Sequence, residues 1–100
     1  MSVLLELSIF PIDKGESVSA HVSEVVRMIR DSGIDYRLTP MGTVIETEVL
    51  SDALAIVERA ASILQDRGCR RVYSAIKLDI RDGKSGRLEQ KIRSVEEKIG

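Results

Sequence analysis

Aromatic residues are scarce in this chain of 100 residues, which has no tryptophan and only Phe10, Tyr36 and Tyr73 as rings. A core with so few rings must be aliphatic, and the 43% hydrophobic content is enough for one such core. The same scarcity leaves few rings to stack on a flat ligand. We therefore expect a single small domain spanning residues 1–100, without a large buried active-site cavity.

Cysteine and histidine each occur once, as Cys69 and His21. One cysteine excludes an internal disulfide, and the pair is too small for a Cys/His metal cluster, so we expect no metal site. No apolar run approaches the ~20 residues of a membrane span, and no secretory signal is recognisable around residues 3–9. These absences predict a cytoplasmic protein without a membrane partner. His21 is then a surface or boundary residue, and Cys69 a small, partly buried one.

Neither sign of charge dominates, since 15 Lys and Arg residues stand against 16 Asp and Glu, a net charge of −1. Such a surface has no basic footprint for nucleic acid or anionic lipid. The segment 83–86, Gly-Lys-Ser-Gly, does match the G-x-x-G loop with which KH domains clamp a nucleic-acid backbone. Because it follows a predicted strand instead of a helix, we interpret it as a flexible loop and expect no nucleic-acid partner.

What the chain does contain is a regular succession of strand and helix patterns. Period-two hydrophobicity predicts strands at 2–10, 34–40, 42–49 and 71–80. Stripes of helical spacing predict helices from Ser17 or Ser19 to about 32, from Ser51 to Gly68, and over 88–99. The order β-α-β-β-α-β-α is typical of an α+β, ferredoxin-like βαββαβ fold with an extra C-terminal helix. Right-handed crossovers then give a four-stranded antiparallel sheet of order 4-1-3-2, with two helices on one face.

One face of that sheet is left without helices. If the purely apolar rows pack on the helices, the bare face carries a mixed set of side chains: Glu6, Ser8, Phe10, Arg37, Thr39, Glu46, Glu48, Tyr73, Lys77 and Asp79. This mixture is too polar for a hidden core and too apolar for plain solvent, which is typical of an association surface. The stripe of the C-terminal helix also needs a partner. We therefore expect the chain to assemble with copies of itself in closed symmetry.

The carboxylates of the bare face allow three interpretations. Glu6, Glu46 and Glu48, with Lys77, fit a binding site for a cationic or amino-bearing ligand. Alternatively, these charged groups pair with one another and with Arg37 across strands or subunits, in contacts worth only ~0.2–1 kcal/mol each. Acid–base catalysis would need environments that split two carboxyl pKa values, and no nucleophile or base pattern accompanies these residues. We therefore expect no enzymatic activity.

The most informative stretch is the hairpin at Pro40-Met41-Gly42, where Pro40 fixes its own φ and Gly42 accepts a positive φ. The run Tyr36-x-Leu38-x-Pro40-Met41-Gly42-Thr43-x-Ile45-Glu46 resembles the signature of the YkoF-like family of small thiamine-binding proteins. Further matches are Phe10-Pro11, Arg71-Val72, residues 76–81 and Lys91-x-x-Ser94-Val95, so the resemblance spans nearly the whole chain. It departs at Thr47, where glycine is expected, and at His21, where an aromatic residue is common.

The resemblance implies a ferredoxin-like subunit, a homotetramer built as a dimer of dimers, and binding of thiamine or its hydroxymethylpyrimidine part at subunit interfaces, without turnover. An aminopyrimidine needs hydrogen-bond donors and acceptors beside an apolar wall, and a thiazolium needs negative potential. We expect polar contacts from Glu6, Ser8, Thr43 and Glu46, and walls from Phe10 and Met41 beside Gly42. No other cofactor is expected, and the role would be that of a carrier or sensor. The alternative is a structural or regulatory homo-oligomer without a small ligand.

Overall fold

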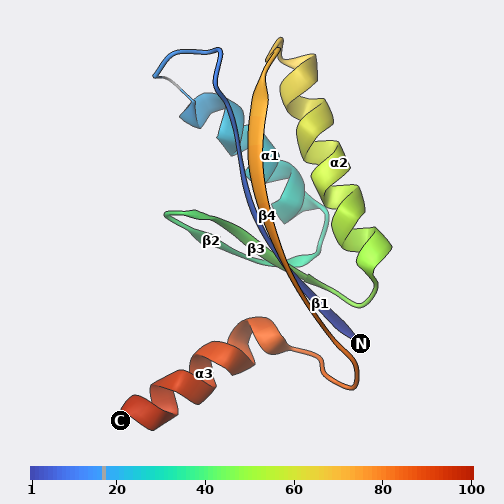
Figure 1. Cartoon of the computed structure of the whole chain (residues 1–100), viewed down its shortest axis with the longest axis vertical. Coiled ribbons are helices and arrows are strands. Elements are labelled where there is room, and N and C mark those ends of the chain that lie inside the picture. Colours follow the sequence, from blue (N-terminus) through green and yellow to red (C-terminus); the bar gives the residue numbers. More distant parts are fainter. Residues whose placement is uncertain (17) are drawn as a thin grey trace.

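The computed structural model describes residues 1–16 and 18–100; Ser17, one of the two predicted caps of the first helix, lies outside the described residues. Every predicted element is present, in the predicted order (Figure 1). The elements are β1 (Ser2–Pro11), α1 (Ser19–Asp31), β2 (Asp35–Thr39), β3 (Gly42–Thr47), α2 (Leu50–Asp66), β4 (Val72–Arg81) and α3 (Arg87–Ile99).

The strands form one antiparallel sheet in the order β2-β3-β1-β4, which is the predicted order 4-1-3-2 counted from the other edge. The register places Leu5 of β1 opposite both Ile45 of β3 and Leu78 of β4, so these three side chains point to the same face. α1 and α2 pack on that face, and the opposite face, which we call the open face, carries neither of them. The α+β, ferredoxin-like βαββαβ class is confirmed.

The core between the sheet and the two helices is aliphatic, as the composition predicts. It consists of Val3, Leu5, Leu7, Ile9, Val25, Met28, Ile29, Ile45, Ala53, Ile56, Ala60, Leu64 and Cys69. The rings of Phe10 and Tyr73 instead face each other on the open face, with their centroids 5.8 Å apart. Full burial of a large aliphatic side chain contributes ~1.5–3 kcal/mol, so packing against this core stabilises both helices.

The starts of these helices depend on that packing and not on serine caps. α2 begins one residue before Ser51, directly after the extended residue Val49, so the predicted cap at Ser51 is wrong. α1 begins at Ser19 itself, which is therefore inside the helix and not its cap. The predicted ends are confirmed, because Gly33 and Gly68 follow the two helices with φ values of 80° and 81°.

One edge of the sheet and the C-terminal helix are uncovered. β4 is an edge strand, and its helix-side residues Ile76, Leu78 and Ile80 are 42%, 45% and 49% exposed. α3 projects from the body of the molecule (Figure 1). Its exposed apolar stripe consists of Ile92, Val95 and Ile99. Among the described residues, no helix is long and apolar enough to cross a membrane.

Candidate functional site

A cavity of about 220 Å³, which we call the hairpin cavity, lies between α1 and the hairpin formed by β2 and β3. Its lining comes from residues 7–10 of β1, residues 38–43 of the hairpin, and an apolar row comprising Val18, Val22, Val25, Val26 and Ile29. Each of the lining side chains in the described part of the chain is neutral. The cavity thus offers apolar walls with a few hydroxyl and backbone groups, which is the usual composition of a small-molecule site.

The turn beside this cavity is held by Thr39. Its Oγ1 accepts hydrogen bonds from the N–H groups of Met41 at 3.2 Å and Gly42 at 3.1 Å, and donates one to the carbonyl oxygen of Gly42 at 2.8 Å. Gly42 lies so close to β1 that a Cβ atom there would be 2.8 Å from the carbonyl oxygen of Leu7. The hairpin is therefore pressed against β1, while Met41, 82% exposed, lies at the rim of the cavity.

The structure divides the predicted ligand-binding residues into two groups. Ser8, Phe10, Met41, Gly42 and Thr43 all line the hairpin cavity, although they come from two strands and the turn. Glu6 and Glu46 lie on the open face and do not line it.

Glu6 pairs with Lys77, which lies directly opposite on β4, at 3.9 Å. The two side chains are 41% and 85% exposed, so this contact is a weak surface ion pair.

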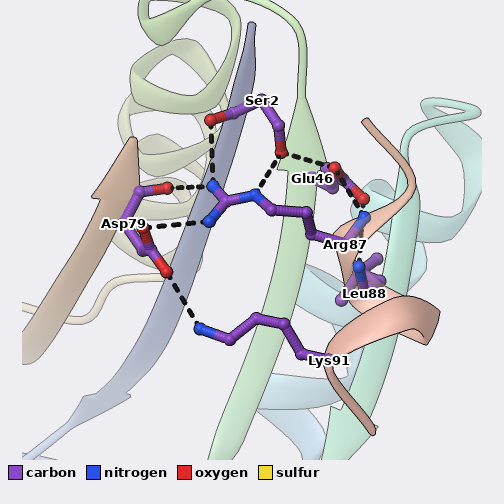
Figure 2. A network of polar contacts seen from close by, with 6 residues as sticks. All are labelled: Ser2, Glu46, Asp79, Arg87, Leu88 and Lys91. Atoms are coloured by element: carbon purple, nitrogen blue, oxygen red, sulfur yellow. Dashed lines mark hydrogen bonds and ion pairs between the residues drawn. The ribbon is translucent and has the colours of Figure 1, made fainter. Parts of the chain in front are cut away.

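Glu46 belongs to a polar network at the start of α3 (Figure 2). Its Oε2 accepts hydrogen bonds from Ser2 Oγ at 2.5 Å and from the backbone N–H of Arg87 at 3.0 Å. Its Oε1 accepts one from the backbone N–H of Leu88 at 3.2 Å. Burial alone would raise the pKa of Glu46, but these hydrogen bonds and the charge of Arg87 outweigh it and hold the pKa below its ordinary value.

Arg87, like Ser2, belongs to this network although the sequence did not reveal its role. Its guanidinium is 4% exposed and reaches from α3 across the start of β1 to β4 (Figure 2). It donates to Ser2 Oγ and to the Ser2 carbonyl oxygen, both at 2.9 Å, and it pairs with Asp79 Oδ1 at 2.9 Å. Lys91 donates to the other carboxylate oxygen of Asp79 at 2.9 Å, and the hydrogen bonds from Lys91 and Arg87 lower the pKa of Asp79. The network fastens α3 to the sheet.

A second hollow, which we call the α1–β2 groove, adjoins the hairpin cavity. It has a volume of about 420 Å³ and is lined by Ser19, Val22, Ser23, Val26, Arg27 and Arg30 of α1 with Tyr36 and Leu38 of β2. Val22, Val26 and Leu38 belong to both hollows, so the two share a wall.

His21 and Cys69 meet away from both hollows. Arg67 Nε donates a hydrogen bond to His21 Nδ1 at 3.0 Å, and the Sγ atom of Cys69 lies 3.7 Å from the same nitrogen. Cys69 is a free cysteine and only 3% exposed. Within residues 1–16 and 18–100, no group of three or more His, Cys, Asp and Glu residues is placed to hold a metal ion.

The chain thus belongs to the α+β class of ferredoxin-like domains and has a small cavity with a neutral lining. Residues 5–96 match the family model described as thiamine-binding protein, and the chain belongs to that family. The family resemblance indicated by the hairpin run is thereby confirmed.

Several relatives support this assignment. A UPF0045 protein of Mycobacterium tuberculosis is 38% identical over 96 residues, which cover 96% of this chain and 93% of the relative. The UPF0045 protein YqgV of Bacillus subtilis is 37% identical over 97 residues, covering 92% of each. Among solved structures, the hypothetical protein MJ1052 of Methanocaldococcus jannaschii superposes with a TM-score of 0.82 at 32% identity, covering 96% of this chain and 97% of the other.

A more distant structure shows the same fold. It is that of a proposed thiamine biosynthesis/salvage protein of Thermotoga maritima, with a TM-score of 0.81 at 18% identity, covering 95% of this chain and 99% of the other.

Proposed function

We propose that this protein binds thiamine, or the hydroxymethylpyrimidine part of thiamine, in the hairpin cavity and releases it unchanged, as a carrier or sensor. The observation that carries the proposal is the convergence of Ser8, Phe10, Met41, Gly42 and Thr43 on one cavity. Membership of the thiamine-binding protein family supports it, as does the thiamine biosynthesis/salvage role proposed for the Thermotoga neighbour.

The size of the cavity favours a single ring. Pockets for drug-sized ligands typically measure roughly 300–1,000 Å³, and the hairpin cavity has about 220 Å³. The hydroxyl group of Thr43 is available to the nitrogen atoms of an aminopyrimidine, and the valines of α1 would cover its faces. We propose ligand contacts for the five cavity-lining residues, and pairing roles for Glu6 and Glu46.

The proposed assembly is a homotetramer formed as a dimer of dimers, with the site at a subunit interface. Two separate surfaces support it. The open face carries the Phe10–Tyr73 ring pair among charged groups. The edge strand β4 and the stripe of α3 expose a second set of apolar residues. Phe10 connects the first surface with the cavity, because it contacts Tyr73 and also lines the cavity. The free, buried Cys69 accords with a cytoplasmic location.

Calorimetric titration with thiamine and with hydroxymethylpyrimidine tests the site. Thr43 and Thr47 form a matched pair, since both are buried on the helix side of β3, at 6% and 8% exposure, but only Thr43 lines the cavity. Thr43→Val removes one hydroxyl from the cavity and should weaken binding about tenfold, while Thr47→Val should leave it unchanged. Equal effects of the two variants would contradict the proposed site.

The alternative function is a structural or regulatory homo-oligomer without a small ligand. The exposed apolar residues of β4 and α3 favour it, because they account for assembly with no reference to the cavity. Thermal unfolding distinguishes the two functions, since a ligand at ~100 times its Kd stabilises the folded form by ~2.7 kcal/mol. No shift with thiamine, thiamine phosphate or hydroxymethylpyrimidine would favour the alternative.

A further inference from the structure

The α1–β2 groove differs from the hairpin cavity in charge. The hairpin cavity has a neutral lining, whereas the groove beyond Leu38 carries two cationic side chains, Arg27 and Arg30. Neither hollow is lined by an acidic residue of the described chain. A cationic thiazolium ring placed in the groove would therefore find no counter-charge in the lining, while an anion would find two.

The two arginines are only loosely engaged elsewhere. Arg27 lies 3.7 Å from Glu24, three residues earlier on the same helix, and is 59% exposed. Arg30 pairs with its neighbour Asp31 at 2.9 Å, with both side chains 61% exposed. Pairs as exposed as these contribute little and exchange readily for a better partner. A phosphate group is such a partner, because it accepts two parallel hydrogen bonds from one guanidinium.

The order of residues along α1 runs from the cavity toward this charge. Val22, Val26 and Arg30 are spaced by four residues and lie on one side of the helix. At a rise of ~1.5 Å per residue, the Cα atom of Arg30 lies ~6 Å beyond that of Val26, the last residue of this row that also lines the hairpin cavity. A ring in the cavity with a short substituent directed along α1 would bring that substituent to the arginines.

We propose that the α1–β2 groove is the subsite for a phosphate monoester carried by the ligand, so that the full site takes a phosphorylated aminopyrimidine compound in preference to its unphosphorylated form. This inference rests on the proposed function, because it assumes that the ring occupies the hairpin cavity. The phosphate has two chemical sources, the hydroxymethyl group of the free pyrimidine and the hydroxyethyl group of thiamine. The first places the phosphate one methylene group from the pyrimidine ring, and the second places it beyond the thiazolium ring, at the end of a two-carbon arm.

Four titrations of the full chain test the proposal: hydroxymethylpyrimidine, its phosphate, thiamine and thiamine monophosphate. In at least one of the two pairs, we expect the phosphate ester to bind about tenfold more tightly than the unphosphorylated parent. This difference in affinity should become smaller as salt is added. The pair in which the ester binds more tightly than its parent identifies the source of the phosphate. The double variant Arg27→Gln/Arg30→Gln should lower the affinity for that ester to that of the parent, and leave the parent's own affinity unchanged.

The matched control is Arg59→Gln/Arg93→Gln, which removes the same charge from exposed positions of α2 and α3 outside the groove. It should preserve the preference for the ester. Equal binding of ester and parent in both pairs, or a preference that survives loss of Arg27 and Arg30, would overturn the phosphate subsite while thiamine binding stands. Failure of all four compounds to bind would overturn the proposed function itself.

Discussion

Glu46 caps the first turn of α3 from a distant strand: its Oε2 accepts a hydrogen bond at 3.0 Å from the backbone N–H of Arg87, which is 41 residues away along the chain. The first N–H groups of a helix have no partner within the helix, and a carboxylate there is also favoured by the helix dipole. The residue in the local cap position, Gly86, has no side chain to serve this purpose. A residue of β3 therefore fixes where α3 begins.

Replacing Glu46 with glutamine should loosen α3. The variant keeps an acceptor oxygen but loses the charge, so we expect the free energy of unfolding to fall by about 1 kcal/mol. Urea unfolding measures this loss, and hydrogen exchange should show faster exchange in the first turn of α3. Glu48→Gln is the control, since Glu48 is exposed, directly follows the end of β3 and is not one of the residues of this network. Equal effects of the two variants would contradict the capping role.

Stability should fall in acid because of the same network. The pKa values of Glu46 and Asp79 lie below their ordinary values of 4.5 and 3.8 in the folded chain. The folded state therefore binds fewer protons than the unfolded state, and the stabilisation is complete above about pH 4.5 and is lost as the pH falls through the folded pKa values. Unfolding in urea between pH 7 and pH 3 should show this decline. Glu46→Gln should be less sensitive to acid than the wild type, and identical pH profiles would argue against the contribution of Glu46.

Arg87→Lys should destabilise the protein even though it conserves the charge. A single ammonium group cannot make the divergent bonds that the guanidinium makes to Ser2 and Asp79. We expect a loss of about 2 kcal/mol in urea unfolding, since hydrogen bonds to charged groups contribute ~1.5–3 kcal/mol. Arg93→Lys is the matched control, because Arg93 is 66% exposed and, within the described residues, forms an ion pair only with Glu89 of its own helix, at 3.8 Å. A loss below that of the control would contradict the anchoring role of Arg87.

Gly42→Ala should move the hairpin away from β1. The added Cβ atom would lie 2.8 Å from the carbonyl oxygen of Leu7, a backbone atom that cannot turn aside. Such overpacking costs ~1–3 kcal/mol, and it should also weaken thiamine binding because the hairpin lines the cavity. Gly83→Ala introduces the same methyl group where nothing lies within 4 Å. That control should leave affinity unchanged, and an unchanged affinity in Gly42→Ala as well would count against the cavity as the site.

Leu78→Lys should reduce the size of the assembly. Leu78 is 45% exposed on the edge strand β4, and a charge at a contact between copies would be left without a partner. Leu54→Lys on α2 is the control, since Leu54 is 44% exposed and lies outside the edge strand. Analytical ultracentrifugation should show a smaller species for Leu78→Lys alone. A wild-type protein that stays monomeric at micromolar concentration would refute the assembly.

The arrangement of strands and helices could be predicted because its signals are local. One face of β1 is predicted to be buried because apolar residues alternate along it, at Val3, Leu5, Leu7 and Ile9. This prediction does not require that the partner strands be known. The hairpin run likewise predicts a turn, and therefore predicts that Met41, Gly42 and Thr43 lie close to one another. The helix starts could not be predicted in this way, since burial of the apolar faces outweighed the serine signals.

The remaining features depend on contacts between distant parts of the chain. Arg87 looks like any charged residue of an amphipathic helix, and its burial follows from a hydrogen bond to Ser2, 85 residues away. The valines of α1 were recognised as a core stripe, but only the packed hairpin shows that they also line a cavity. The same holds for Glu46: the strand pattern predicts its place on the open face, but not its hydrogen bonds to Ser2 and to the start of α3.

The polar network also affects the order in which the chain can fold during synthesis. Ser2 is synthesised before Glu46, and Glu46 before Arg87. The sheet can assemble before Arg87 emerges, but Ser2 and Glu46 then lack the cation that joins them. The nascent chain therefore reaches its final stability only when α3 has been made. A stop codon just before Arg87 would produce a sheet in which Ser2, Glu46 and Asp79 lack their contacts with Arg87.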